Sequence, residues 1–289
     1  MDPEALTLTM DIEADGAMLE GDLTCPGQAV GLVIFAHGSG SSRLSPRNRF
    51  VADRLNASGL GTLLFDLLTT DEASHAANRF DIELLAQRLR TATHAVGHIA
   101  RERQLRLGYF GASTGAAAAI RAAAGPDGPY RIDAVVSRGG RPDLAGVEAL
   151  AQLACPTLLI VGAADVEVLE LNRQAMAEMR CEKALESVPY ATHLFEEPGT
   201  LEHAAELAGQ SATTLIIAPQ FLNETDVAMH PVAETVLRWQ GNEWMAGGES
   251  TAPFRLSAFA ALDEIIARLG VQLAAGRQAY WVCPLIEES

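Results

Sequence analysis

Three residues whose side chains could cooperate in nucleophilic catalysis follow one another along the chain. Ser113 lies in the segment GASTG, Asp165 ends the apolar segment PTLLIVGAAD, and His193 ends the segment KALESVPYATH. A serine hydroxyl is a poor nucleophile at neutral pH, so it needs a base within hydrogen-bonding distance, and the base needs an orienting carboxylate. A serine on a strand-to-helix turn requires the chain order serine, acid, histidine. The pattern therefore predicts Ser113 as nucleophile, His193 as base and Asp165 as acid.

The segment around Ser113 has the context of a nucleophile turn. The largely apolar residues 105–111 predict a strand, and the alanine-rich residues 113–125 predict a helix that follows at once. Gly111 and Gly115 flank the serine where a sharp turn leaves little room for side chains. A Gly-x-Ser-x-Gly match is weak by itself, and the alternative is a structural glycine-rich turn. The ordered partners downstream favour catalysis.

Other residues compete for the acid and base roles. Asp143, after the segment VVSRGGRP, could supply the carboxylate from the preceding strand. His193 is one of seven histidines, and the alternative for it is an ordinary loop residue. Asp66, which closes TLLFD, is more typical of a loop or a helix cap. Asp165 and His193 are preferred because each follows a predicted strand, where its side chain can face the same crevice as Ser113.

A serine nucleophile also needs two backbone donors for the oxyanion that develops on the substrate. The N–H of Thr114, the residue after the nucleophile, should be one of them. The other should come from the loop His37–Ser42, HGSGSS, whose glycines permit close backbone approach. We favour Ser39 N–H, with Gly40 N–H as the alternative.

Nearby arginines and two histidines suggest further binding functions. Arg43 and Arg47 follow the donor loop and could receive a carboxylate of the substrate, although helix-surface arginines explain them equally well. His94 and His98 are four residues apart on a predicted helix, a spacing that can bind a metal. Because no third ligand pattern accompanies them, a solvated helix face is expected. We predict no metal and no cofactor.

The composition of the 289 residues disfavours several partners. The formal charge of −16 repels phosphate backbones and anionic lipids, so neither nucleic acid nor a membrane is an expected partner. Lys183 is the only lysine and no Gly-x-x-x-x-Gly-Lys occurs, which argues against a P-loop and Schiff-base chemistry. Four widely spaced cysteines and an acidic start without an apolar segment favour a cytoplasmic protein. A homo-oligomer is compatible with the sequence.

The elements that must position the site alternate between strand and helix. Apolar segments at 29–38, 61–68, 105–111, 132–140 and 156–165 predict buried strands, and helical patterns at 46–59, 81–102 and 113–125 lie between them. Residues 183–193 predict a last strand and the loop after it. Residues 5–14 and 17–25 predict an antiparallel pair at the edge of the sheet. The chain is therefore expected to be an α/β protein with a mostly parallel sheet and helices on both faces.

The alternation ends near residue 210, where we predict a domain boundary. Residues 1–210 form the predicted catalytic domain and residues 211–289 an appendage. Within the appendage the sequence predicts a strand at 213–219, a long loop, a helix at 257–270 and a strand-like segment at 278–286.

Residues 30–209 resemble the α/β-hydrolase superfamily, in its dienelactone hydrolase-like group. The resemblance rests on FAHGSGSSRLSPRNRFVADRL, LGYFGASTGAAAA, PTLLIVGAADVEVLELNRQA and ATHLFEEPGTLE. It implies a serine hydrolase that cleaves a small ester or lactone without a cofactor. Relatives named for dienelactone hydrolysis often carry a cysteine nucleophile, whereas this chain has Ser113. An acyltransferase, and a non-catalytic module or inactive scaffold on the same fold, are the alternatives.

The appendage resembles other proteins. Residues 213–268 are similar to the opening strand, loop and helix of a second α/β hydrolase, but no second nucleophile turn follows. Residues 276–289 resemble a short internal segment of the RecG-type DNA helicase. A fused or truncated arrangement is our hypothesis for this region, and helicase function does not transfer because the chain is acidic and has no P-loop.

Overall fold

The fold was analysed in a computed structural model, which describes residues 4–125 and 129–217 and the strands at 236–240, 243–247 and 256–257. Two compact units make up the chain, Met1–Pro219 and Gln220–Ser289. The predicted boundary at residue 210 lies inside the last helix of the first unit. None of the helices in these described ranges is long and apolar enough to cross a membrane.

The first unit is built on one eight-stranded sheet with the order β1-β2-β4-β3-β5-β6-β7-β8. Its strands are β1 (Leu6–Ala14), β2 (Ala17–Cys25), β3 (Gly31–Ala36), β4 (Leu60–Phe65), β5 (Arg106–Ala112), β6 (Ala134–Arg138), β7 (Thr157–Gly162) and β8 (Lys183–Val188). β1 and β2 form an antiparallel hairpin that also joins β4 in antiparallel fashion, and all later pairs are parallel. The predicted fold class and the antiparallel edge are confirmed.

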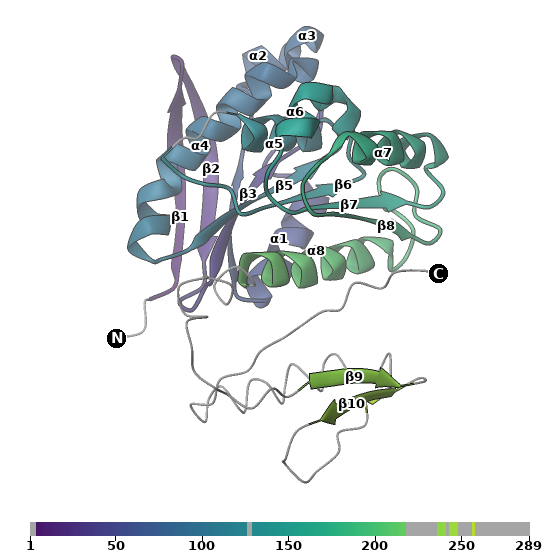
Figure 1. The fold of residues 1–289 in the computed structure, drawn as a ribbon. Coiled ribbons are helices and arrows are strands. Elements are labelled where there is room, and N and C mark those ends of the chain that lie inside the picture. Colours follow the sequence, from purple (N-terminus) through teal and green to yellow (C-terminus); the bar gives the residue numbers. More distant parts are fainter. Residues whose placement is uncertain (1–3, 126–128, 218–235, 241–242, 248–255, 258–289) are drawn as a thin grey trace. The chain divides into compact units, whose positions relative to one another are not determined.

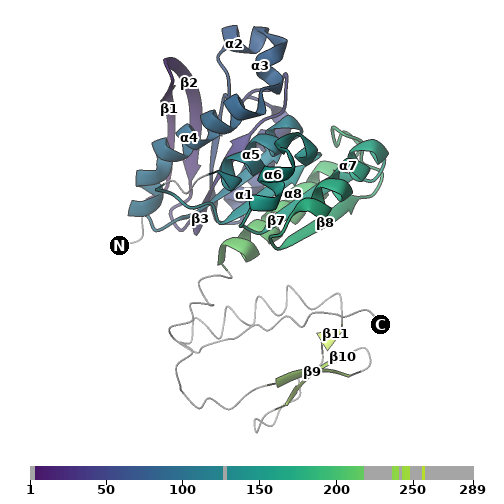
Figure 2. The same cartoon turned by 45° about the horizontal axis from the view of Figure 1, so that its top comes forward.

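Helices cover both faces of this sheet. They are α1 (Pro46–Ala57), α2 (Thr70–Ser74), α3 (Ala76–Phe80), α4 (Ile82–Glu102), α5 (Thr114–Ala124), α6 (Val147–Gln152), α7 (Val166–Glu178) and α8 (Thr200–Ile217), with a 3-10 turn η1 at Pro142–Ala145. Figures 1 and 2 show α4, α5, α6 and α7 along one face and α1 and α8 along the other. The two larger buried apolar clusters follow the same division.

The central strands are continuous runs of mostly apolar residues, because helices bury both faces of the sheet. Every residue of β3, β4 and β7 is buried, which is the pattern of parallel strands between two helix layers. The helix starts follow local rules as well. Ser45 caps α1 by accepting a hydrogen bond from Asn48 N–H at 3.4 Å, and Pro46 occupies the first helical position.

One predicted element of the appendage is wrong. We predicted a strand at 213–219, but residues 213–217 continue α8. A short apolar run cannot be assigned to helix or strand by periodicity alone, and here the preceding helix extends through it. The predicted helix at 257–270 and the segment 278–286 lie outside the described residues, apart from Ser257.

The second unit contains a small antiparallel sheet within the region that we predicted as a long loop. It consists of β9 (Val236–Gln240), β10 (Glu243–Gly247) and β11 (Leu256–Ser257), in the order β11-β10-β9. The register of β9 and β10 sets Trp239 opposite Trp244.

Candidate active site

Ser113 lies on a sharp turn between β5 and α5. Its backbone has φ 51° and ψ −121°, a conformation that non-glycine residues rarely adopt. This geometry lifts the serine out of the strand and places it directly before the first helical residue, Thr114. Backbone strain of this kind, at a serine beside a helix N-terminus, is typical of a nucleophile turn.

The two glycines that flank Ser113 are required by packing. A Cβ atom on Gly111 would overlap the backbone of Ala116, and one on Gly115 would overlap the carbonyl oxygen of Ala36 in β3. Neither neighbour can give way, because both are backbone atoms of buried elements. The predicted steric demand at these positions is confirmed.

Hydrogen bonds connect Ser113 to His193 and His193 to Asp165. Ser113 Oγ lies 3.2 Å from His193 Nε2, and His193 Nδ1 lies 2.7 Å from Asp165 Oδ2. With the ring proton on Nδ1 donated to the carboxylate, the Nε2 lone pair faces the serine hydroxyl. The side chain of Asp165 is 15% exposed and that of His193 is 37% exposed. The arrangement can accept a proton from the serine and remains open to small molecules.

The sheet brings these three residues together from separate loops. Asp165 follows β7 and precedes α7, while His193 lies between β8 and α8. The histidine loop is held by Thr192, whose N–H and hydroxyl both donate to the Glu197 carboxylate, at 3.0 and 2.7 Å. These bonds hold the pKa of Glu197 below its ordinary value. Nothing in the sequence pattern had indicated this clamp.

Asp143, the alternative acid, is engaged elsewhere. Arg141 donates to both of its carboxylate oxygens, at 2.9 and 2.7 Å. This pairing raises the pKa of Arg141. The histidine therefore has Asp165, and not Asp143, as its carboxylate partner.

The loop after β3 lies directly against Ser113. A Cβ atom on Gly38 would be only 3.0 Å from Ser113 Cβ and 3.2 Å from the Ala112 carbonyl oxygen, so the loop lies in tight contact with the turn. Ser39 N–H donates to Thr114 Oγ1 at 2.8 Å. The structure thus brings together the two residues predicted as oxyanion donors, but the Ser39 N–H is bonded to the threonine side chain. Gly40, the alternative donor, has φ +74° in the same loop.

His37 anchors this loop, a role that we did not predict. Its Nε2 accepts a hydrogen bond from Leu67 N–H at 3.0 Å, and its Nδ1 lies 3.0 Å from the Gly38 carbonyl oxygen. Since Nε2 accepts, the ring is neutral and carries its proton on Nδ1. Burial is the main cause that lowers the pKa of His37, partly opposed by the Gly38 hydrogen bond and the charge of Asp66.

A solved structure decides the family of this chain. The dienelactone hydrolase of Anabaena variabilis is 47% identical, with a TM-score of 0.67, and the match covers 73% of this chain and 98% of that one. The chain belongs to the dienelactone hydrolase-like group of the α/β hydrolases. Est1E of Butyrivibrio proteoclasticus shares the fold at 18% identity, with a TM-score of 0.59 over 72% of this chain and 98% of its own. No protein-family model matches the chain.

Curated relatives of this α/β hydrolase occur in two strains of Mycobacterium tuberculosis. Each is 53% identical over 207 residues, which are 72% of this chain and 46% of the relative. Both carry the name "Putative phosphoribosyl transferase". The chain spans about half the length of these relatives.

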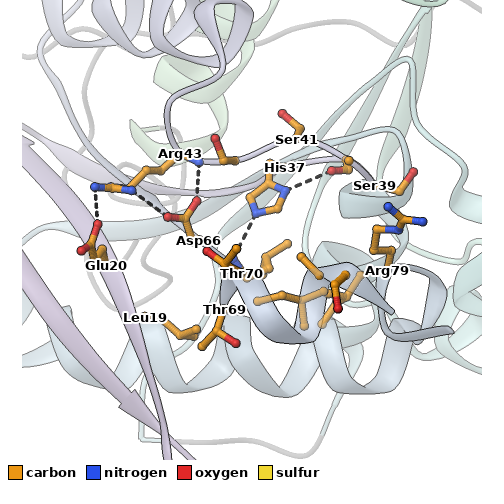
Figure 3. Close-up of a pocket in the computed structure, with 18 of the residues that line it drawn as sticks. Leu19, Glu20, His37, Ser39, Ser41, Arg43, Asp66, Thr69, Thr70 and Arg79 are labelled. Carbon is orange, nitrogen blue, oxygen red and sulfur yellow. Dashed lines mark hydrogen bonds and ion pairs between the residues drawn. The ribbon is translucent and has the colours of Figure 1, made fainter. Parts of the chain in front are cut away.

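A cavity of about 680 Å³ is lined by the donor loop, but not by Ser113, Asp165 or His193 (Figure 3). Its wall consists of the start of β2, the loop 37–43, the segment 66–70, and side chains from α2, α3 and α4. Hydroxyl groups are frequent in this wall, contributed by Ser39, Ser41, Ser42, Thr69, Thr70 and Ser74. The wall thus combines these hydroxyl groups with apolar side chains such as Leu19 and Leu68, and the cavity borders on Ser39.

Arg43 lines this cavity but is committed to carboxylates of the protein. Its guanidinium lies 2.8 Å from Asp66, 2.5 Å from Glu20 and 3.4 Å from Asp22, and its backbone N–H also donates to Asp66. We predicted Arg43 as a receptor for a substrate carboxylate. The structure does not support that role, because the charge is already neutralised. Arg47 similarly lies 3.4 Å from Glu196.

Arg79 differs from Arg43 although both line the same cavity. Among the described residues, no carboxylate lies within ion-pairing distance of Arg79, and the side chain is only partly exposed. In Figure 3 it lies apart from the cluster of Arg43, Asp66 and Glu20. Arg79 is thus available to a bound anion.

The two helix histidines do not form a metal site in the described part of the chain. His94 and His98 are exposed on α4, and His94 contacts the edge of the Tyr130 ring at 5.6 Å between centroids. Within the described ranges, no group of three His, Cys, Asp or Glu side chains is arranged to hold a metal ion.

Proposed function

We propose that this α/β hydrolase is a serine hydrolase that cleaves a small ester or lactone through an acyl-enzyme. The observation that carries the proposal is the continuous hydrogen-bonded series Ser113, His193, Asp165 on a strained nucleophile turn. Each group has the partner that its role requires, since the nucleophile faces a base and the base faces a carboxylate.

The reaction would proceed in two halves. Ser113 Oγ attacks the acyl carbon while His193 Nε2 takes the serine proton, and the carbonyl electron pair moves onto oxygen. His193 then gives that proton to the leaving alcohol as the C–O bond breaks. In the second half His193 takes a proton from water, hydroxide adds to the acyl carbon, and Ser113 leaves with the proton. Asp165 stabilises the imidazolium in both halves.

The cavity beside the donor loop supports a substrate with polar groups. Its hydroxyl-rich wall and Arg79 favour an acyl or alcohol part that carries a carboxylate or another anion. This preference is part of the proposal, and no particular lactone is implied. The nucleophile, base and acid series favours acyl transfer over the phosphoribosyl transfer that the name of the longer relatives describes.

The test combines turnover with covalent labelling. Wild-type protein should hydrolyse p-nitrophenyl acetate and be labelled by a fluorophosphonate probe at Ser113, as located by mass spectrometry. Ser113→Ala should abolish both without changing the melting temperature. Ser187→Ala, at an exposed serine of β8, is the matched control and should behave as wild type. Wild type that is neither labelled nor active would indicate a non-catalytic scaffold, and a labelled protein that passes the acyl group only to added alcohols would be an acyltransferase.

A further inference from the structure

Arg138, the last residue of β6, carries a buried charge that no carboxylate among the described residues neutralises. Arg138 is 7% exposed, and within the described part of the chain its Nε and Nη1 atoms have no hydrogen-bond partner. Its Nη2 donates to Asn48 Oδ1 at 3.3 Å, and its guanidinium lies 5.6 Å from the centre of the Phe195 ring. A neutral amide and an aromatic ring replace only part of the hydration of a guanidinium, which has five N–H donors.

The charge beside Arg138 has the same sign. Burial, and to a smaller extent the charge of Arg47, lower the pKa of Arg138 to about 10. Arg47 lies in the first turn of α1, which contains no acidic residue, and the start of a helix is the positive end of its dipole. Two guanidinium groups beside a helix N-terminus repel one another, but together they are suited to an oxyanion.

This positive cluster reaches solvent through Arg47. The side chain of Arg47 is 36% exposed, and its Nη1 lies 3.4 Å from Oε1 of Glu196, whose side chain is 64% exposed. An exposed ion pair at this distance contributes little to stability, so another anion can replace the glutamate. An anion that takes the place of Glu196 on Arg47 would come beside the unpaired guanidinium of Arg138.

We propose that Arg138 and Arg47 form a binding site for a small oxyanion of the phosphate class, between the start of α1 and the loop that carries His193. The bound anion would accept hydrogen bonds from the unpartnered donors of Arg138 and neutralise the buried charge. The site is separate from the cavity that contains Arg79, since neither Arg138 nor Arg47 lines that cavity. It would exist whether or not the protein is a hydrolase.

The site nevertheless borders the reacting groups. The carbonyl oxygen of Arg138 accepts a hydrogen bond from Ser113 N–H at 3.3 Å. The next residue, Gly139, packs against the histidine loop, because a Cβ atom there would lie 3.1 Å from the His193 carbonyl oxygen and 3.3 Å from the Phe195 ring. An anion at this place would therefore rest against the segment that holds the base, without contacting Ser113 through any of its proposed ligands.

The melting temperature of the full chain tests the proposal with inorganic phosphate as the probe. At constant ionic strength, phosphate should raise the melting temperature of the wild type in a saturable manner, by about 3 °C or more, and sodium chloride should not. Arg138→Met should abolish this rise. Without phosphate it should raise the melting temperature by about 2–4 °C, because an unpaired buried charge is replaced by an apolar side chain of similar length.

A matched control carries the identical substitution at an arginine that is paired. Arg43→Met removes the partner of Asp66 and Glu20, so it should lower the melting temperature and keep the rise caused by phosphate. The two variants thus differ in sign without phosphate and in response with it.

A second variant tests the exchange with Glu196. Glu196→Gln removes the carboxylate that competes for Arg47, so the Kd for phosphate measured by calorimetry should fall by about two- to fivefold. Glu202→Gln, at an exposed glutamate of α8, is the control and should leave the Kd unchanged. An unchanged or higher Kd in Glu196→Gln would contradict the proposed entry of the anion at Arg47.

Three results would overturn the site itself. They are a wild type that responds to phosphate no more than to chloride, a phosphate response that persists in Arg138→Met, and a lower melting temperature of Arg138→Met without phosphate. The last result would mean that Asn48 and Phe195 suffice as partners of the guanidinium. None of these measurements requires turnover, so they are independent of the proposed hydrolase activity.

Discussion

The donor loop contacts two regions, the turn at Ser113 and the cavity wall at Arg43, and different kinds of contact stabilise each of them. On the Ser113 side, glycines meet backbone atoms, as Gly115 does at the Ala36 carbonyl, so only one residue type fits. On the cavity side, the wall is held by ion pairs between side chains, as between Arg43 and Asp66. Substitutions can replace one ion pair by another, whereas no substitution changes the backbone atoms against which a glycine packs. The reacting groups thus lie on a fixed turn, and the groups that would select the substrate lie on a wall that can vary.

The largest expected effect concerns the carboxylate on the fixed side. Asp165→Asn should lower kcat for p-nitrophenyl acetate by about 10⁴-fold, because the amide no longer stabilises the imidazolium and favours the wrong tautomer of His193. Asp143→Asn is the matched control, and its activity should stay within about threefold of wild type, since Asp143 pairs with Arg141. Equal losses in the two variants would show that the hydrogen bond of 2.7 Å to His193 does not govern the base.

The steric difference between the two sides can be measured as stability. Gly115→Ala should lower the free energy of unfolding by about 3 kcal/mol or more, because the added Cβ has no space beside Ala36. Gly209→Ala in α8 is the control, since its added Cβ would make only ordinary contacts, at 3.6 Å or more. This change should be neutral or stabilising by up to about 1 kcal/mol. Urea unfolding measures the free energy of unfolding of both variants. Equal changes in the two variants would contradict the claim that the turn at Gly115 has no space for a Cβ atom.

The difference between backbone contacts at the turn and side-chain ion pairs in the cavity wall also explains which features the sequence could predict. The turn at Ser113 and the strand and helix on either side of it follow from local rules, because the glycines and the apolar residues there are required by their immediate neighbours in the chain and in the sheet. The partners of Arg43 come from β2 and from the end of β4, and no local pattern indicates that Glu20 and Asp66 converge on it. The short helices α2 and α3, which contribute to the cavity wall, were missed because five-residue helices have almost no periodicity.

The roles of the two cavity arginines can be separated by one pair of substrates. Arg79→Gln should raise KM for the anionic mono-p-nitrophenyl succinate by about tenfold, the loss expected for one charge-assisted hydrogen bond, and leave neutral p-nitrophenyl acetate unaffected. Arg43→Gln, the identical substitution at a neutralised arginine, should lower the melting temperature without changing the ratio of the two KM values. A change of that ratio in Arg43→Gln alone would return the anion-binding role to Arg43.

The smallest expected effect concerns His37, which connects the two sides, and it takes the form of a pH dependence. Burial lowers the pKa of His37 in the folded protein, so the unfolded chain binds a proton at this position more readily. The folded state therefore loses stability as the pH falls below about 6.5, the ordinary pKa of histidine.

His37→Asn should lower the free energy of unfolding by about 1–3 kcal/mol at pH 7.5, because the hydrogen bond to Leu67 N–H is lost. The same substitution should flatten the decline of the melting temperature between pH 7.5 and 5.5. His98→Asn, at an exposed histidine of α4, should keep the wild-type slope. An unchanged slope in His37→Asn would mean that the acid sensitivity arises elsewhere, and that the neutral ring of His37 is not what holds the donor loop between the turn and the cavity.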